Sequence, residues 1–342
     1  MIEIDGAHGE GGGQLVRTAV SVAAARGVPI RVFNIRARRA VPGLAAQHAA
    51  AVRAVAALCD ARCEGLELRS TVLTFQPQRL RGGEFQIEVG TAGSIALVLQ
   101  AMLPAALATG QRVVMTIRGG TDVRAAPPMD YARAVLLPLL ARMGVQAELS
   151  ILRRGYYPRG GGEARLALQP VAQLAPFTVT DPGPVERIEI FTHVARLAHQ
   201  VAERMEAAAR AELPPAMPVE AALEACGPQL AAGPGGAIVL RAAMAHTTLG
   251  SGQVAERGVP AERLGQLAAR SLNRDLQAGA TLDVHAADQM LVFLAMAHGP
   301  SVFRASQISS HAATAMWLLQ AMTPARFQSV PSAHGVLVHV RP

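Results

Sequence analysis

The segment Ser94–Gly110, SIALVLQAMLPAALATG, is followed directly by Gln111–Gly120, QRVVMTIRGG, and this pair decides the fold. The first part is rich in alanine and leucine, which favours a helix, and the second is rich in β-branched residues, which favours a strand. Gly110 stands at the end of the first part, where glycine suits a helix C-terminus because it readily adopts the left-handed conformation. The pair therefore predicts a buried helix that ends at a glycine and packs against the strand that follows.

The same order of helix, glycine and strand occurs three more times, with Gly27, Gly144 and Gly299 at the joints. The matching sequences are QLVRTAVSVAAARG with VPIRVFNIR, MDYARAVLLPLLARMG with VQAELSILRRG, and AADQMLVFLAMAHG with PSVFRASQIS. Chance similarity between alanine-rich helices is the simpler explanation, but four occurrences with one kind of joint argue against it. The repetition predicts a pseudo-symmetric α/β protein built from similar modules.

The stretch between the third and fourth joints has a different character. It follows the turn-forming sequence Asp181–Pro184, and charged helices are predicted around His199–Glu212 and Ala261–Leu276. We interpret residues 181–276 as a small α/β domain inserted into a larger one. The predicted main domain comprises the remaining residues, 1–180 and 277–342.

The composition is that of a globular protein with an anionic partner. Of the 342 residues, 51% are apolar and 17% are charged, which excludes a disordered chain. The net charge of +7 favours a nucleic acid or a nucleotide as partner, although a basic surface that only aids solubility explains it equally well. The chain contains no lysine. Lysine-adenylate, Schiff-base and P-loop lysine chemistry are therefore excluded.

The cysteines and the apolar segments bear on the compartment. Three cysteines without a CxxC spacing argue against a disulfide framework or a zinc site, and they favour a reducing cytoplasm. No charged-then-apolar leader is evident at the N-terminus. The longest apolar stretch, Ile95–Thr109, is too short to span a bilayer. We therefore expect a cytoplasmic protein without a membrane partner, and the oligomeric state is left open.

A glycine-rich segment, His8–Gln14, lies between a predicted strand, Ile2–Asp5, and a predicted helix. Glycines allow the backbone to approach a ligand closely, and the N-terminus of the following helix favours an anion. Glu10 is suited to hold a divalent metal, and Arg17 is suited to meet a phosphate. Turns of this kind are common, so the signal is weak by itself.

Arginines gather in the next predicted loop, which contains Arg36, Arg38 and Arg39 and is followed by Gln47 and His48. A charged loop is usually only solvated. This loop, however, is short and lies between an apolar strand and an apolar helix. That placement offers several guanidinium groups to one phosphate-rich ligand.

A histidine, His311, opens a predicted helix directly after Ser309 and Ser310. The positive end of the helix dipole disfavours the charged imidazolium form, and a neutral imidazole is what a nucleophile needs. The same helix end stabilises an approaching phosphate. Taken alone, a histidine in this place is more often structural. The remaining histidines, His193 among them, have no comparable setting and receive no role.

Three further turns complete the set of candidates. Val89–Ser94 and Arg118–Asp122 are ordinary turns, or they place further helix N-termini near one site if they occupy equivalent points of the repeat. In the third segment, His285–Gln289, Asp288 is equally well explained as a helix N-cap or a first-turn acid.

Together these segments resemble the RNA 3′-terminal phosphate cyclase family. The matching stretches run in order from residue 5 to about residue 327, and they are GEGGGQLVRTA, NIRARRAVPGLAAQH, VGTAGS, GGTDVRAAPPMDY, GYYPRGGGE, HAADQM and the SSH before the last helix. Several motifs in a fixed order are far more specific than any one of them. The stretch 181–276 matches poorly.

The resemblance implies a fold of repeated βαβαββ modules, similar to enolpyruvyl transferases, with a small α/β insert. It also implies an activity, in which ATP drives the conversion of an RNA 3′-phosphate end to a 2′,3′-cyclic phosphate with release of AMP and pyrophosphate. His311 would attack the α-phosphorus of ATP and form a histidine-AMP intermediate. AMP would then pass to the RNA 3′-phosphate, and the neighbouring 2′-OH would expel it.

The resemblance also implies roles for individual residues. Glu10 would bind Mg²⁺ or Mn²⁺ beside the triphosphate. Asp288 matches a functionally important position near His311. The residues that would engage phosphates are Arg17, Arg36 and Arg39, and those that would surround the nucleotide are Gln14, Gln47, His48, Pro127, Pro128, His285 and Gln289.

The sequence departs from the family at one position of the implied nucleotide pocket. The family commonly has a tyrosine three residues before the aspartate, and this chain has His285 there. Imidazole can also stack on a base, so the departure affects nucleotide preference or affinity.

Two other families of explanation remain at this point. A non-catalytic branch that resembles this family acts in ribosomal RNA processing, but it lacks the nucleophilic histidine that this chain retains as His311. Enolpyruvyl-transferase-like enzymes rely on lysines, which are absent here. A simple RNA-binding scaffold would account for the charge but not for the setting of His311.

Overall fold

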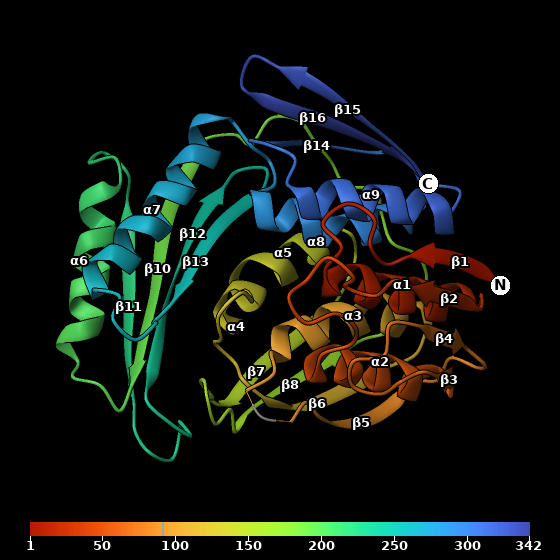
Figure 1. Cartoon of the computed structure of the whole chain (residues 1–342). Coiled ribbons are helices and arrows are strands. Elements are labelled where there is room, and N and C mark those ends of the chain that lie inside the picture. The colour runs from red at the N-terminus through yellow and green to blue at the C-terminus, as the bar shows by residue number, and fades with distance from the viewer. Residues whose placement is uncertain (91) are drawn as a thin grey trace.

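The computed structural model describes residues 1–90 and 92–342, so Thr91, in the predicted turn VGTAGS, lies outside the described residues. Across these residues, sixteen strands form four four-stranded sheets. Three sheets belong to repeated modules, and the fourth belongs to the stretch that interrupts the last module (Figure 1).

Each module has the element order βαβαββ. The first contains β1 (Ile2–Asp5), α1 (Gly13–Arg26), β2 (Ile30–Phe33), α2 (Ala46–Cys59), β3 (Arg62–Glu64) and β4 (Leu73–Gln76). The second contains β5 (Gly83–Glu88), α3 (Ile95–Ala108), β6 (Val113–Gly119), α4 (Met129–Tyr131), η1 (Ala132–Leu136), α5 (Leu137–Ala141), β7 (Ala147–Arg153) and β8 (Gly162–Leu168). The third contains β9 (Thr178–Val179), α8 (Val284–Ala295), β14 (Ser301–Ala305), α9 (Ser310–Met322), β15 (Arg326–Ser332) and β16 (Gly335–Arg341).

The three sheets share one topology. In each, the strands lie in the order first, second, fourth, third, as in β1-β2-β4-β3. The first two strands of each sheet are parallel, and the other pairs are antiparallel. A parallel pair needs a crossover connection, and a helix provides it in every module. The predicted fold class of repeated βαβαββ modules is therefore confirmed.

The glycine joints explain how most helices end. Gly27, Gly110 and Gly144 have φ angles of 65°, 62° and 91°, in the left-handed region that glycine tolerates best. Two helices end without glycine, and the sequence pattern missed them for this reason. The first is α2, which ends at Asp60 with φ 46°, and the other is α9, which ends at Thr323.

The predicted helix over residues 129–144 is not uniform. It consists of the short helix α4, a π-helical turn η1 and α5. Pro138 has no N–H to donate to the carbonyl four residues earlier, and the π-helical turn ends two residues before it. The sequence predicted one helix because its apolar residues continue through the irregular turn.

The core lies between the helices and the outer sheets. In Figure 1 the helices gather at the centre, where α1 contacts α2, α3 and α9, and α8 contacts α9. Alanine-rich faces let these helices approach one another closely, and one buried cluster runs from Ile4 to Val340. Of the helices formed by residues 1–90 and 92–342, none combines the length and the apolar character required to cross a bilayer.

The interrupting stretch lies between β9 and α8 of the third module. It contains β10 (Val185–Ala195), α6 (Gln200–Glu212), β11 (Val219–Cys226), β12 (Gly235–Met244), β13 (Thr248–Val254) and α7 (Ala261–Gln277). Its sheet has the order β11-β10-β12-β13, and α6 and α7 pack together on one face of it (Figure 1). A separate hydrophobic cluster fills the space between them. On this basis we propose that residues 181–276 form an inserted domain and that 1–180 plus 277–342 form the main domain.

Candidate active site

One cavity of about 710 Å³ is lined by all thirteen residues that the sequence predicted for the site. Its walls come from five places, which are the glycine turn before α1, the arginine loop before α2, the segment Val123–Pro128, the starts of α8 and α9, and β13 of the insert. The volume lies in the range of small-molecule sites. Residues from all three modules and from the insert therefore meet at one place.

The glycine turn is built to let side chains approach it. A Cβ on Gly13 would lie 1.9 Å from His48 Nε2, and a Cβ on Gly12 would lie 2.1 Å from Glu10 Oε2. A Cβ on Gly9 would lie 2.3 Å from Thr314 Oγ1. Since real Cβ contacts this short do not occur, these three positions require glycine. The glycines thus bring Glu10, His48 and α9 together.

Glu10 connects the glycine turn to the arginine loop and to α9. Its backbone N–H donates to Thr314 Oγ1 at 3.1 Å. Its carboxylate forms an ion pair with Arg39, and Oε2 lies 3.7 Å from His311 Nδ1. The imidazole is 48% exposed, so it is open to the cavity. The structure therefore places His311 beside both the glycine turn and the arginine loop.

The start of α9 is fixed by Ser309. Its side-chain oxygen accepts a hydrogen bond from the N–H of Ala312 at 2.9 Å, as an N-cap does. The same hydroxyl donates to Asp288 Oδ1 at 2.6 Å, and burial raises the pKa of Asp288 above its ordinary value. Asp288 is not the N-cap of α8, because that position belongs to Asp283. Asp288 instead holds the cap of the helix that carries His311.

Two arginines give the cavity its positive charge. Arg17 on α1 is partly buried, and burial lowers its pKa to about 10, so it stays charged at neutral pH. Within residues 1–90 and 92–342, no carboxylate lies within ion-pair distance of Arg17. Arg36, in a left-handed conformation with φ 54°, donates from Nη1 to the carbonyl of Gly43 at 2.7 Å. A half-buried cation without an acid partner is a site for an anion.

His48 is the neutral counterpart of these arginines. Burial, with help from Arg17 and Arg36, lowers the pKa of His48 to about 3. Its Nδ1 accepts a hydrogen bond from the N–H of Ala45 at 3.2 Å. A neutral imidazole that accepts at Nδ1 carries its hydrogen on Nε2. His48 therefore presents an uncharged donor at the cavity.

Amide side chains line the inner end of the cavity. Gln14 Oε1 is buried and has no hydrogen-bond partner among the described residues. Gln100 Nε2 donates to Gln289 Oε1 at 2.9 Å, which joins α3 to α8. Gln47, in the first turn of α2, is partly exposed. An orphaned buried acceptor of this kind requires a partner that the protein itself does not supply.

The opposite wall is apolar and closes around the start of α8. Pro127 and Pro128 form part of it, and His285 packs edge-on against Tyr131 with ring centroids 6.4 Å apart. The buried carboxylate of Asp283 accepts a hydrogen bond from Tyr131 Oη at 2.7 Å. These rings and prolines make a surface suited to a planar ligand.

The comparisons with known proteins agree with this geometry. The family model described as "RTC: RNA 3'-terminal phosphate cyclase" matches residues 8–329. The chain belongs to the RNA 3′-terminal phosphate cyclase family. A protein of that name from Nitrosospira multiformis is 52% identical over 342 residues, which cover 100% of this chain and 97% of the relative. Another, from Methanopyrus kandleri, is 44% identical over 95% of this chain and 94% of its own length.

A solved structure is also similar. The enolpyruvyl transferase NikO from Streptomyces tendae aligns with 99% of this chain and 47% of its own, at a TM-score of 0.41 and 12% sequence identity. A likeness of this size establishes nothing about the site of the cyclase family member described here.

Sequence reasoning missed several residues of this cyclase-family cavity. Gln100, Tyr131 and Gln253 line it but received no role. Gln100 carries a signal, since it is a polar residue that interrupts the apolar stretch Ile95–Thr109. Gln253 lies on β13, in the insert, where no motif pointed to the site. The insert also contributes Glu256, which forms an ion pair with Arg124 at 3.5 Å across the cavity mouth.

Proposed function

We propose that this chain is an RNA 3′-phosphate cyclase that uses ATP to convert an RNA 3′-phosphate end to a 2′,3′-cyclic phosphate. The reaction would pass through a covalent histidine-AMP and an RNA-adenylate, and it would release AMP and pyrophosphate. The position of His311 carries the proposal. Its ring opens into a cavity in which Glu10 faces one nitrogen and Arg17 and Arg36 supply positive charge.

The first step is a nucleophilic attack by His311. Because Glu10 Oε2 faces Nδ1 at 3.7 Å, the ring hydrogen is favoured at Nδ1, and the lone pair of Nε2 is free to attack. A bond forms between Nε2 and the α-phosphorus of ATP, and the bond to pyrophosphate breaks. The imidazole ring becomes cationic on adenylylation, and the carboxylate of Glu10 would stabilise that charge.

Three features of the cavity would stabilise the phosphates. Arg17 and Arg36 would neutralise negative charge, and the Nε2–H of His48 would donate a hydrogen bond. The N-terminus of α9 adds unpaired backbone N–H groups beside His311. These groups are fixed before the reaction, so little reorganisation is needed when charge moves to the leaving pyrophosphate.

The residues also fit a divalent cation. The carboxylate of Glu10 and the orphaned Gln14 Oε1 are hard oxygen donors, which Mg²⁺ and Mn²⁺ prefer, and Mg²⁺ is commonly held by one or two carboxylates together with substrate phosphates. Glu10 would hold the ion, and the ion would neutralise phosphate charge. Arg39, now paired with Glu10, would then be free to contact a phosphate.

The later steps use the RNA itself. The RNA 3′-phosphate oxygen attacks the AMP phosphorus, and the bond to His311 breaks, which restores the free ring. The neighbouring 2′-OH then attacks the activated 3′-phosphorus and AMP leaves. Because the 2′-OH is already held beside that phosphorus, the closure is intramolecular and fast. The net charge of +7 would attract the RNA.

The adenine would rest against the apolar wall of Pro127, Pro128 and His285. His285 would take the place of the tyrosine that is common in the family, so the ring area available for stacking is smaller. The chain contains no lysine, so no amine side chain competes for the role of nucleophile.

The test is covalent labelling with α-labelled ATP and Mg²⁺ or Mn²⁺. We expect the wild-type protein to take up label and the His311→Ala variant to take up none. Trypsin should then give one labelled peptide, residues 305–326, which contains His311 as its one histidine. The mass of this peptide should rise by one adenylyl group, and the label should be acid-labile, as expected of a phosphorus–nitrogen bond.

The matched control is His334→Ala, which removes an exposed histidine near the C-terminus and should label normally. The labelled protein is next mixed with an RNA that carries a 3′-phosphate, and a cyclic end should form. Label on a different peptide would refute the assignment of His311. RNA binding without any labelling would favour the non-catalytic cyclase-like protein of ribosomal RNA processing.

A further inference from the structure

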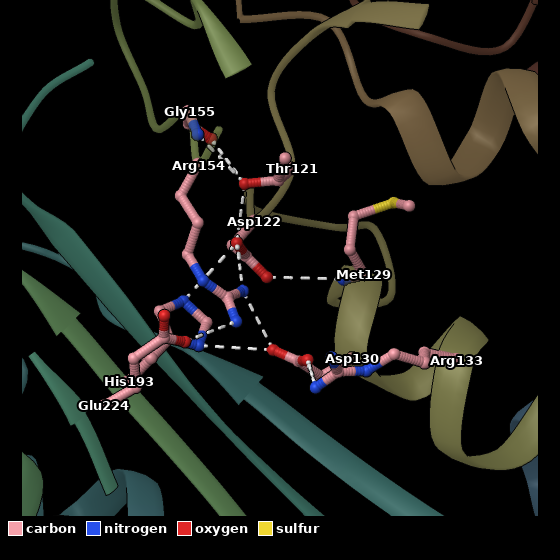
Figure 2. A network of polar contacts seen from close by, with 9 residues as sticks. All are labelled: Thr121, Asp122, Met129, Asp130, Arg133, Arg154, Gly155, His193 and Glu224. Carbon is pink, nitrogen blue, oxygen red and sulfur yellow. Dashed lines mark hydrogen bonds and ion pairs between the residues drawn. The ribbon is translucent and has the colours of Figure 1, made fainter. Parts of the chain in front are cut away.

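A buried cluster of charged side chains lies outside the cavity, where the main domain meets the insert (Figure 2). Asp122 follows β6, Asp130 lies in α4, and Arg154 follows β7. His193 lies on β10 of the insert. The exposed fractions of these four residues are 1%, 1%, 5% and 2%, so all are shielded from water.

The two bases bridge the two acids. Arg154 Nη1 lies 2.8 Å from Asp130 Oδ2 and 3.5 Å from Asp122 Oδ2. His193 contacts the same oxygens, with Nδ1 3.3 Å from Asp130 Oδ2 and Nε2 3.4 Å from Asp122 Oδ2. Figure 2 shows the guanidinium and the imidazole between the carboxylates. Two acids are thus matched by two bases in a space without solvent, which is the condition for a stable buried ion-pair network.

The charge states agree with this balance. Burial by itself raises the pKa of Asp130, but His193 and Arg154 outweigh burial and hold this pKa well below its usual range. Burial likewise lowers the pKa of His193, and Asp122 and Asp130 reverse the direction.

The cluster is tied to both domains. Arg154 Nη2 donates to Glu224 of the insert at 3.2 Å, and the backbone of Arg154 pairs with Leu230 and Ala232. Thr121 Oγ1 donates to Asp122 Oδ2 at 2.7 Å. The cluster therefore joins β7 of the main domain, the insert and the segment that begins at Asp122.

The two acids bracket the apolar wall of the cavity. Asp122 immediately precedes Val123–Pro128, which line the cavity, and Asp130 follows two residues after it. Asp122 Oδ1 also accepts from the N–H of Met129 at 3.3 Å, so the acids clamp the segment from both ends. Between the clamps, Arg124 is exposed and Ala125 has φ 58°, a left-handed conformation that alanine rarely adopts.

A metal ion would be the other explanation of this cluster, because Asp122, Asp130 and His193 have ligand atoms within 4.8 Å of one another. The guanidinium of Arg154 already contacts both carboxylates, and a dication would be repelled by it. The arrangement therefore favours an internal cation over a metal.

We propose that Arg154 and His193 are positioning residues that act through Asp122 and Asp130 to hold Val123–Pro128 as the wall of the nucleotide cavity. The insert thereby contributes to nucleotide binding from a residue, His193, that does not reach the cavity. The nucleotide part of this statement rests on the proposed function, whereas the effect on the wall itself does not.

The first experiment measures the wall without nucleotide. Trypsin cleaves after arginine, and Arg124 is the arginine within the wall segment. We expect the Arg154→Met and His193→Gln variants to be cleaved at Arg124 about tenfold faster than the wild type, because local opening controls cleavage. Cleavage at Arg38, an exposed site in the arginine loop, should keep its wild-type rate. His193→Gln retains the guanidinium and serves where Arg154→Met does not fold.

The second experiment measures labelling by ATP as a function of ATP concentration. We expect both variants to raise the KM for ATP about tenfold with a maximal rate within about twofold of wild type, because His311 and Glu10 stand on other elements. Arg154→Lys should restore part of the affinity. The matched control is Arg241→Met, which breaks an ion pair of 2.7 Å with Glu189 on the same insert sheet and should leave the KM unchanged.

The outcomes separate the two proposals. Unchanged cleavage at Arg124 in both variants would overturn the positioning role, whatever ATP does. Faster cleavage with no labelling of the wild type would support the wall clamp and count against the cyclase reaction. A lower melting temperature with an unchanged KM would reduce the cluster to a structural network. Stoichiometric metal in the purified protein that is lost in Asp130→Asn would replace the proposal with a metal site.

Discussion

His311 Nδ1 lies 3.7 Å from Glu10 Oε2, which joins the last helix of the chain to the glycine turn before the first. The two residues belong to different modules, and neither helix alone could form the site. Thr314 reinforces the junction, since it accepts a hydrogen bond from the Glu10 backbone and donates to the carbonyl of Ser310. The candidate active site is therefore a product of how the first and third modules pack.

Replacement of Glu10 by glutamine should slow adenylylation. The amide retains the shape of the side chain but loses the charge that faces Nδ1 and pairs with Arg39. We expect the labelling rate at saturating ATP to fall about 10- to 100-fold, as for other residues that orient a reactive ring. Glu3→Gln, on the exposed surface of β1, is the control and should label normally. A wild-type rate in Glu10→Gln would exclude the carboxylate from the reaction.

Ser309→Ala should separate helix capping from catalysis. The change removes the N-cap of α9 and the donor to Asp288. We expect a loss of stability of about 1 kcal/mol together with slower labelling. Ser94→Ala removes the equivalent cap of α3, where Ser94 Oγ accepts from Leu97, and should cause a similar stability loss with normal labelling. If both variants label equally well, the link from Ser309 to Asp288 does not matter for the reaction.

Arg17→Met should weaken ATP binding. Arg17 is a partly buried cation at the cavity, and methionine keeps the apolar stem while removing the charge. We expect the KM for ATP to rise at least about tenfold, which corresponds to about 1.4 kcal/mol of lost binding. Arg38→Met, an exposed arginine that does not line the cavity, should change the KM by less than about twofold. Equal effects of the two variants would mean that only the overall charge matters.

Asp275 should make the protein less stable as the pH rises. This carboxyl on α7 is 1% exposed and accepts a hydrogen bond from Ser306, and burial raises its pKa from 3.8 to about 6. Between these two values the folded state holds the proton and the unfolded state releases it, so stability falls with rising pH through this window. Above pH 6 the full loss, about 3 kcal/mol, is present.

The Asp275→Asn variant should therefore be more stable than wild type above pH 6, and the difference should vanish near pH 4. Thermal midpoints measured from pH 4 to pH 8 would show this. Asp60→Asn, at an exposed helix end, should show no such trend. A difference that grows toward low pH would contradict the assigned direction.

The sequence by itself determined the modules and the identity of most site residues. Glycine joints such as Gly27 and Gly110 require a left-handed backbone, and the apolar periods around them leave helix and strand as the stable local structures. Local chemistry of this kind is readable from the chain. It failed where another residue took the left-handed position, as Asp60 does after α2.

Only the tertiary structure decided which separated residues act together. Glu10 and His311, or Asp122 and His193, meet because whole modules and the insert pack against one another. Their contacts depend on burial and charge balance across domains, which leave no period or motif in the sequence. For the same reason Asp288 proved to hold Ser309 rather than to cap its own helix, because a hydrogen bond of 2.6 Å between two helices is set by packing and not by position in the chain.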